Sequence, residues 1–118
     1  MPVTRGDVIL TYVANVGSAG GKVRPALGVQ SDHNNARLNE TIIAAITSNL
    51  SRVQEATQLL IEVTNPAGAA SGLLHDSAVR CERLHSIPQA EVRRVIGTLS
   101  DALMLEVNDC LKAALGLP

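Results

Sequence analysis

Aromatic side chains are nearly absent from this chain of 118 residues, which has no phenylalanine, no tryptophan and a single tyrosine, Tyr12. Because 46% of the residues are nevertheless apolar, the hydrophobic core must be built from leucine, isoleucine, valine and alanine. A chain of this length forms one domain, which we expect to span residues 1–118.

Cysteine, long apolar runs and net charge are equally scarce. Cys81 and Cys110 have no partners at metal-ligand spacing and are too few for a disulfide scaffold, so we expect reduced, buried thiols and no metal site. No apolar segment approaches the roughly 20 residues that cross a bilayer, so a soluble, cytoplasmic protein with no membrane partner is expected. A formal net charge of -1 provides no global attraction for nucleic acid, and any phosphate site must be local.

A glycine-rich segment at residues 17–22 invites comparison with a phosphate-binding loop. The Walker spacing would require glycine where Val16 stands and a hydroxyl residue where Val23 stands. We therefore exclude nucleotide binding, expect no cofactor, and interpret residues 14–23 as a flexible hairpin loop that delivers Lys22 and Arg24 to the next strand.

Six short segments have the brevity and the β-branched content of strands. They cover residues 8–13, 25–31, 41–47, 57–64, 77–84 and 93–99. Residues 32–35 have the Asp and Asn content of a turn, whereas residues 86–89 have the form of a helix capping box and predict a short helix through about Val92.

The C-terminal residues predict one amphipathic helix that begins after Ser100 and ends at Gly116. Its apolar face comprises Leu103, Val107, Cys110, Leu111 and Ala114. Strands at intervals followed by one such helix predict a mainly β fold with some α structure, a small SH3-like antiparallel barrel with a C-terminal helix.

Polar residues stand at the ends of two neighbouring strands, where Arg24-Pro25 opens one and Ile46-Thr47-Ser48 closes the next. The forked guanidinium of an arginine suits bidentate contact with a phosphate. The hydroxyls of Thr47 and Ser48 can donate to phosphate oxygens or orient a ribose 2'-OH. These residues predict a phosphate site at the sheet edge.

A second polar pair lies on the strand predicted at residues 77–84. Alternation places Arg80 and Glu82 on one face, opposite Val79 and Cys81. The pair can be a simple ion pair or part of a site. Among the three histidines, which could exchange protons near neutral pH, His75 is the best candidate because it shortly precedes this strand.

Together with residues 5–8 (Arg-Gly-Asp-Val) and residues 96–100 (Ile-Gly-Thr-Leu-Ser), these motifs resemble the MazF/PemK toxins, sequence-specific endoribonucleases of bacterial type II toxin-antitoxin systems. Arg80-Cys81-Glu82 is similar to the Arg-Cys-Asp segment of the Kid/PemK branch, with a longer carboxylate. The resemblance implies a CcdB/PemK-like barrel, metal-independent cleavage of single-stranded RNA, a small cognate antitoxin and a homodimer.

The resemblance also implies roles for individual residues. The catalytic set is Arg24, Thr47, Arg80 and Glu82. The RNA-binding set is Lys22, Ser48, His75 and Arg83. Either Glu82 or a nearby histidine would take the 2'-OH proton, and the products would be a 2',3'-cyclic phosphate and a 5'-OH end.

Two alternatives remain open at this point. A gyrase-binding toxin like CcdB would share the fold, but the tryptophan of that toxin's C-terminal tail has no counterpart in this chain. A degenerate family member would keep only the barrel and the surface that binds the antitoxin.

Overall fold

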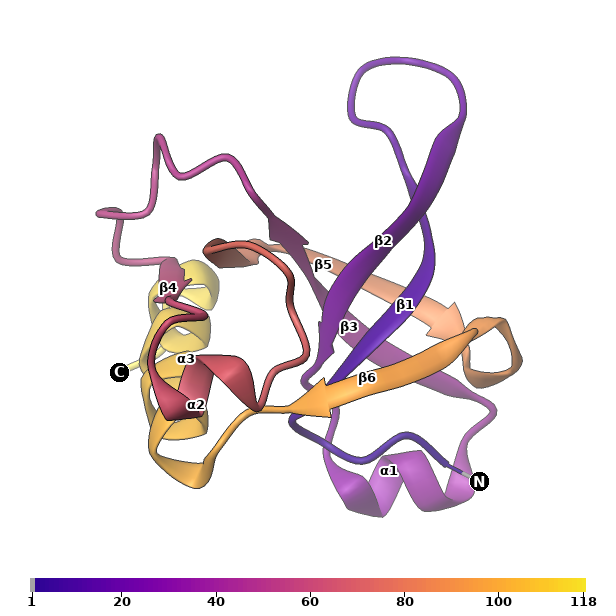
Figure 1. The fold of residues 1–118 in the computed structure, drawn as a ribbon. Coiled ribbons are helices and arrows are strands. Elements are labelled where there is room, and N and C mark those ends of the chain that lie inside the picture. The colour runs from indigo at the N-terminus through magenta and orange to yellow at the C-terminus, as the bar shows by residue number, and fades with distance from the viewer. Residues whose placement is uncertain (1) are drawn as a thin grey trace.

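The computed structural model describes residues 2–118 and contains one antiparallel sheet of six strands (Figure 1). The strands lie in the order β4-β5-β3-β2-β1-β6. Their bounds are β1 Asp7–Ala14, β2 Gly21–Gly28, β3 Glu40–Thr47, β4 Gln58–Ile61, β5 Ser77–Pro88 and β6 Arg94–Thr98. The helices are α1 Asp32–Arg37, α2 Pro66–Ala69 and α3 Asp101–Leu115, with a 3-10 turn at Gln89–Glu91.

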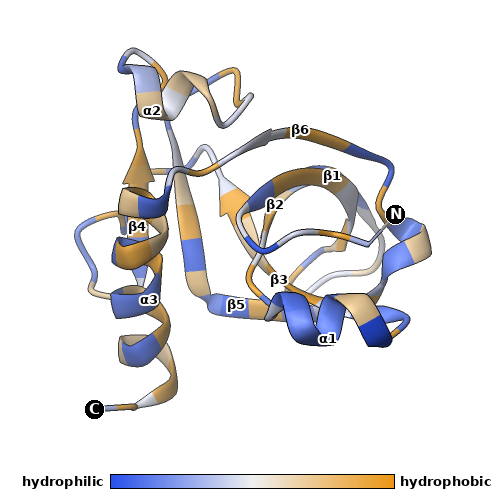
Figure 2. Cartoon of the chain, turned by 90° about the horizontal axis from the view of Figure 1, so that it is seen from below, coloured by the Kyte–Doolittle hydropathy of each residue, from blue (hydrophilic) through white to orange (hydrophobic). Residues whose placement is uncertain are grey.

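The sheet is strongly curled, and α3 packs on the end formed by β4 and β5 (Figure 2). Apolar residues alternate between two clusters, as the period of two in a strand requires. Val8 and Leu27 belong to the larger cluster under α3, whereas their neighbours Ile9 and Ala26 belong to a smaller cluster on the other face. The predicted mainly β fold, a small SH3-like antiparallel barrel with a C-terminal helix, is confirmed as a six-stranded antiparallel sheet that curls into a half-barrel.

The C-terminal helix begins and ends as the sequence predicts. The Ser100 hydroxyl accepts a hydrogen bond from the backbone N–H of Leu103, and Gly116 adopts a left-handed φ of 69°. The helix buries Cys110 beside Cys81, and both thiols are free. Burial raises the pKa of Cys81 to about 12, so this thiol is a protonated packing group. No described helix has the length and apolarity needed to cross a membrane.

The predicted turn at residues 32–35 is wrong, because these residues begin helix α1. The Ser31 hydroxyl caps it by accepting from the N–H of Asn34. The Asn35 side chain is buried, and its Oδ1 accepts hydrogen bonds from Gln30 Nε2 (3.0 Å) and Thr41 Oγ1 (2.8 Å). This tertiary network stabilises a helix of six residues that local sequence alone does not specify.

The helix predicted from residue 86 is also wrong in its first turn. Ser86 and Ile87 continue β5 by pairing with Ile42 and Thr41 of β3, and only Gln89–Glu91 form a 3-10 turn. The strand β2 begins at Gly21 rather than at residue 25, so the predicted loop is shorter. Lys22 and Arg24 therefore lie on a strand, which fixes their backbone more firmly than a loop would.

Candidate active site

Three cavities meet at Thr47, at the end of β3. The large cavity has a volume of about 560 Å³, the central cavity about 130 Å³ and the third, called here the Gln58 pocket, about 120 Å³. Thr47 lines all three, Arg24 lines the large and central cavities, and Arg80 lines the central cavity and the Gln58 pocket. The structure thus brings together three of the four residues predicted to be catalytic.

The sheet order explains this convergence. Arg24, Thr47 and Arg80 come from the adjacent strands β2, β3 and β5. Ala45 of β3 pairs with Ala26 of β2 on one side and with Arg80 of β5 on the other. Since residues two apart on a strand share a face, Arg24 and Thr47 lie on the same face as this row.

An irregularity in β5 sets the position of Arg80. Ala44 pairs with Leu84, but the next residue, Ala45, pairs with Arg80, so β5 bulges over residues 81–83. Without the bulge, a different residue of β5 would face Ala45. The bulge also brings Arg83 to the wall of the central cavity.

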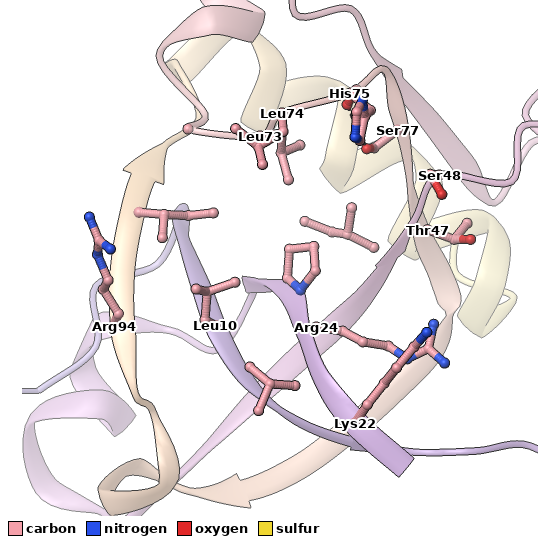
Figure 3. Close-up of a pocket in the computed structure, with 15 residues that line it drawn as sticks. Leu10, Lys22, Arg24, Thr47, Ser48, Leu73, Leu74, His75, Ser77 and Arg94 are labelled. Atoms are coloured by element: carbon pink, nitrogen blue, oxygen red, sulfur yellow. Dashed lines mark hydrogen bonds between the residues drawn. The ribbon is translucent and has the colours of Figure 1, made fainter.

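The Arg24 guanidinium has no carboxylate partner among residues 2–118. It lies with Lys22 on the side of β2 that faces Thr47 (Figure 3). An unpaired arginine fork at a cavity wall can bind a phosphate without first breaking an ion pair.

The hydroxyl of Thr47 is oriented by its own turn. Its Oγ1 accepts a hydrogen bond of 3.1 Å from the backbone N–H of Asn49. With that lone pair engaged, the hydroxyl proton is free to be donated to a ligand oxygen in the cavities. Ser48, the next residue, lines the large cavity.

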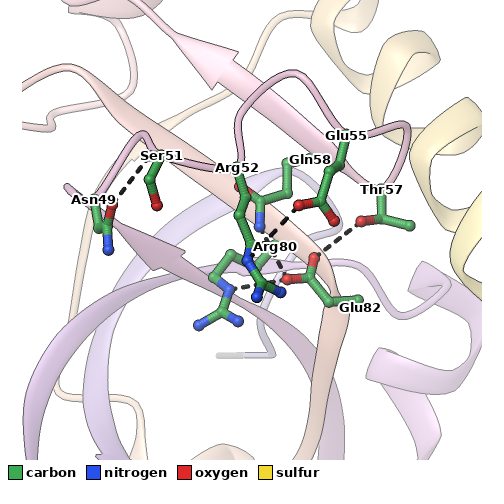
Figure 4. Close-up of polar contacts among 8 residues, drawn as sticks. All are labelled: Asn49, Ser51, Arg52, Glu55, Thr57, Gln58, Arg80 and Glu82. Carbon is green, nitrogen blue, oxygen red and sulfur yellow. Dashed lines mark hydrogen bonds and ion pairs between the residues drawn. The ribbon is translucent and has the colours of Figure 1, made fainter.

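Arg80 and Glu82 form an ion pair in which Arg80 Nε lies 3.0 Å from Glu82 Oε2 (Figure 4). The same carboxylate accepts hydrogen bonds from Gln58 Nε2 (3.0 Å) and Thr57 Oγ1 (3.3 Å). This arrangement uses the Nε of Arg80 and leaves both of its terminal nitrogens for a ligand. The predicted shared face of Arg80 and Glu82 is confirmed.

The surroundings of Glu82 favour its ionised form. Burial acts to raise the pKa of Glu82, but hydrogen bonds from its own backbone N–H, from Arg80 and from Gln58 outweigh burial and lower the pKa below its ordinary value. The carboxylate is therefore charged at neutral pH and a weak proton acceptor. Glu82 lines none of the three cavities, although its partner Arg80 lines two of them.

The remaining predicted residues divide between two cavities. Lys22, Ser48 and His75 line the large cavity, and Arg83 lines the central one. The backbone carbonyl of His75 accepts a hydrogen bond of 2.8 Å from the hydroxyl of Ser77. Among residues 2–118, His75 is the only histidine that lines these cavities.

Sequence reasoning missed Gln58 and Asn49, which line the Gln58 pocket. Gln58 stands in an apolar strand and Asn49 in a turn, positions where polar residues are ordinary. Only the hydrogen bonds of the folded chain distinguish them. Within residues 2–118, no group of His, Cys, Asp and Glu side chains gathers in a way that could hold a metal ion.

The carboxylate network predicts a pH-dependent contribution of Glu82 to stability. We expect Glu82→Gln to lower the free energy of unfolding by about 1 kcal/mol at pH 7, because the charged acceptor of three side-chain donors is lost. A lowered folded-state pKa stabilises fully above the unfolded pKa, and the contribution is lost as the pH falls through the folded value. The difference from the unmodified protein should therefore shrink below about pH 4, near the ordinary range of a glutamate. Urea unfolding at a series of pH values measures it.

Glu55→Gln is the matched control, because Glu55 forms only an exposed ion pair with Arg52 at 3.7 Å. It should change stability by less than about 0.5 kcal/mol at any pH. A Glu82→Gln difference that stays constant from pH 7 to pH 3 would contradict the proposed charge network.

Comparison with known proteins places this arrangement in a family. A profile of the PemK-like, MazF-like toxins of type II toxin-antitoxin systems matches residues 4–115. The chain is 31% identical over 116 residues to an endoribonuclease MazF of Staphylococcus epidermidis, covering 98% of this chain and 92% of that protein. It is 32% identical over 114 residues to one of Staphylococcus saprophyticus, covering 96% and 91%.

Solved structures share the fold at lower identity. A mycobacterial endoribonuclease in complex with its cognate antitoxin superposes with a TM-score of 0.75 at 21% identity, covering 98% of this chain and 97% of that one. The Mycobacterium tuberculosis toxin MazF-mt6 superposes with a TM-score of 0.73 at 22% identity, covering 93% and 98%.

Proposed function

The chain belongs to the PemK-like, MazF-like toxins of type II toxin-antitoxin systems, and we propose that it cleaves single-stranded RNA in an active site formed by Thr47, Arg24 and Arg80. As a member of this family it is an endoribonuclease toxin neutralised by a cognate antitoxin. The observation that carries the proposed site is the convergence of two arginines on one oriented hydroxyl, where the three cavities meet.

Arg24 and Thr47 bind the scissile phosphate in this mechanism. The unpaired guanidinium donates to the non-bridging oxygens, and the Thr47 hydroxyl donates a further hydrogen bond. The ribose 2'-OH gives up its proton and its oxygen forms a bond to phosphorus. The bond from phosphorus to the 5'-oxygen breaks, and that oxygen takes up a proton from water, giving a 2',3'-cyclic phosphate and a 5'-OH end. Donors that meet the extra negative charge of the pentacoordinate transition state lower the barrier more than donors that bind the ground state.

Arg80 supplies the second cation, and Glu82 holds it in place. An arginine stays protonated at any physiological pH, so Arg80 stabilises charge rather than transferring a proton. Glu82 acts as a positioning residue, because serving as the base would require its carboxylate to leave the donors that surround it. His75 is the better acceptor for the 2'-OH proton, since it lines the large cavity with Arg24 and Thr47.

The flanking nucleotides occupy the cavities on either side of the phosphate. Lys22, Ser48 and Arg83 supply donors for neighbouring phosphates, and Pro25 and Leu73 provide apolar contact for bases where the chain has no aromatic platform. Bases enter such cavities only when they are unpaired and unstacked, which favours single-stranded RNA. The expected location is the cytoplasm, where such RNA is found.

A homodimer is part of the proposal. Tyr12, Val23 and Leu74 are large apolar residues that remain exposed, and Leu74 is 86% exposed. Val23 and Leu74 line the large cavity, so a second copy covering them would also shape the RNA path. Light scattering in solution would measure the mass.

The activity is tested with purified protein and a long single-stranded RNA in the presence of EDTA. We expect cleavage at a small set of related sequences, with 5'-OH ends and cyclic phosphate ends, and no cleavage of the same sequence in a duplex. Intact RNA, or cleavage that requires added magnesium, would overturn the metal-independent mechanism. Intact RNA together with accumulating gyrase–DNA complexes would favour the alternative of a gyrase-binding toxin.

A further inference from the structure

The Gln58 pocket contains a buried hydrogen-bond acceptor that the protein leaves unused. Gln58 is 7% exposed, and within residues 2–118 its Oε1 is buried and accepts no hydrogen bond. An unsatisfied buried polar atom typically costs about 1–3 kcal/mol and calls for an explanation. The pocket is lined by Thr47, Asn49, Ser51, Arg52, Gln58 and Arg80.

The neighbouring carboxylate fixes which way the Gln58 amide points. Glu82 only accepts hydrogen bonds when ionised, and Gln58 Nε2 donates to its Oε2 over 3.0 Å. Turning the amide over would place Oε1 against the carboxylate, so the oxygen must face away from Glu82. Gln58 thus presents an acceptor, not a donor, to any ligand that it meets.

The same pocket is also lined by a hydrogen-bond donor. Asn49 Oδ1 accepts a hydrogen bond of 3.0 Å from the backbone N–H of Ser51, which leaves Asn49 Nδ2 as the free end of that amide (Figure 4). A ligand that satisfies both groups must carry a hydrogen-bond donor beside an acceptor. Gln58 is buried and Asn49 is exposed, so a base that enters the pocket turns its exocyclic group toward Gln58 and its ring nitrogen toward Asn49. In that order adenine and cytosine present an amine donor and then an unprotonated ring nitrogen, whereas uracil and guanine present a carbonyl acceptor and then a ring N–H.

We propose that the Gln58 pocket is a base-specificity subsite for an adenine or cytosine next to the scissile phosphate, whose exocyclic amine donates to Gln58 Oε1. The proposal rests on the proposed function, because the pocket shares Thr47 and Arg80 with the phosphate site. At the same position the O4 of uracil would face Gln58 Oε1, bringing two acceptors together. The pocket therefore favours adenine or cytosine at one position of the cleavage sequence.

The test maps every cleavage site on a long RNA for the unmodified protein, Gln58→Met and Thr57→Ala. Gln58→Met keeps the side-chain length but removes the acceptor. Thr57→Ala is the matched control, because it removes another hydrogen bond to Glu82 from outside the pocket. We expect the unmodified protein to favour adenine or cytosine over uracil at one position, Gln58→Met to reduce that preference about tenfold there alone, and Thr57→Ala to retain it.

A second arm leaves the protein unchanged. Replacing the recognised base with an analogue that lacks the exocyclic amine should slow cleavage about tenfold in the unmodified protein, so the result does not depend on the folding of Gln58→Met. Equal slowing at all sites by both variants, or no effect of the analogue, would overturn the subsite while leaving the endoribonuclease intact. Absence of any cleavage by the unmodified protein would instead overturn the proposed function, and the subsite with it.

Discussion

Replacing Arg24 with alanine is expected to lower kcat/KM for RNA cleavage about a thousandfold, because one preorganised donor to a transition-state anion is typically worth about 10²- to 10³-fold and Arg24 supplies two with a full charge. The fold should be unaffected, since the guanidinium has no carboxylate partner among the described residues. The measurement is single-turnover cleavage of a mapped RNA, with thermal unfolding recorded in parallel.

Two further variants separate charge from geometry. Arg24→Lys keeps the charge but loses the planar fork, and should recover about tenfold of the loss. Arg94→Ala is the control for general electrostatics, because Arg94 lines the same large cavity on its far side from Thr47 (Figure 3) and should change the rate only a few-fold. Equal losses in Arg24→Ala and Arg94→Ala would show that the cavity attracts RNA without a phosphate site at Arg24.

The sequence predicts much of the fold because its local signals agree with one another. The strands at β1 and β3, the serine cap of α3 and its terminal glycine all follow from the period of the apolar residues and from capping chemistry. The proposed phosphate-binding half of the site also follows from the sequence, because Arg24 of β2 and Thr47 at the end of β3 belong to strands that pair with each other.

Other features depend on contacts far apart in the sequence. The bulge in β5 that places Arg80 opposite Ala45 arises from pairing with β3, and α1 is stabilised by the buried Asn35 network. The unused acceptor of Gln58 exists only because Glu82 orients the amide. Such features leave no pattern in the local sequence, so helix and strand propensities do not predict them.

Two of the motifs that identify the family have structural roles here. Arg5 Nε donates to the carbonyl of Val29, and its Nη2 donates to Asn108 of α3 over 2.6 Å, so this arginine joins the N-terminal segment to the helix. Gly97 packs its backbone directly against that of Ser71. A family motif therefore contains both residues that stabilise the fold and residues of the site, and the structure shows which residues have which role.

The largest stability effect is expected for Gly72→Ala, at the point where the segment before β5 crosses β6. Gly72 has a φ of +74°, and a Cβ there would overlap the carbonyl oxygen of Ile96. The adjoining hydrogen bond from Thr98 N–H to the carbonyl of Ala70 holds the two backbone segments together, so they cannot move apart to make space for the Cβ. We expect a loss of about 4 kcal/mol or more in the free energy of unfolding, measured by urea denaturation, because strain and steric overlap act together.

Gly116→Ala separates the two contributions, since Gly116 has nearly the same φ, +69°, but nothing within 4 Å of the added Cβ. It should cost only about 1 kcal/mol, the penalty for a left-handed alanine. The additional loss of unfolding free energy in Gly72→Ala then measures the cost of the steric overlap where the two backbone segments cross. Because the same crossing holds Leu73 and His75 at the wall of the large cavity, any Gly72→Ala protein that still folds should cleave RNA more slowly, whereas Gly116→Ala should cleave at the normal rate. Equal losses of stability in the two variants would mean that the two backbone segments move apart freely at Gly72 and that the cavity wall is not fixed there.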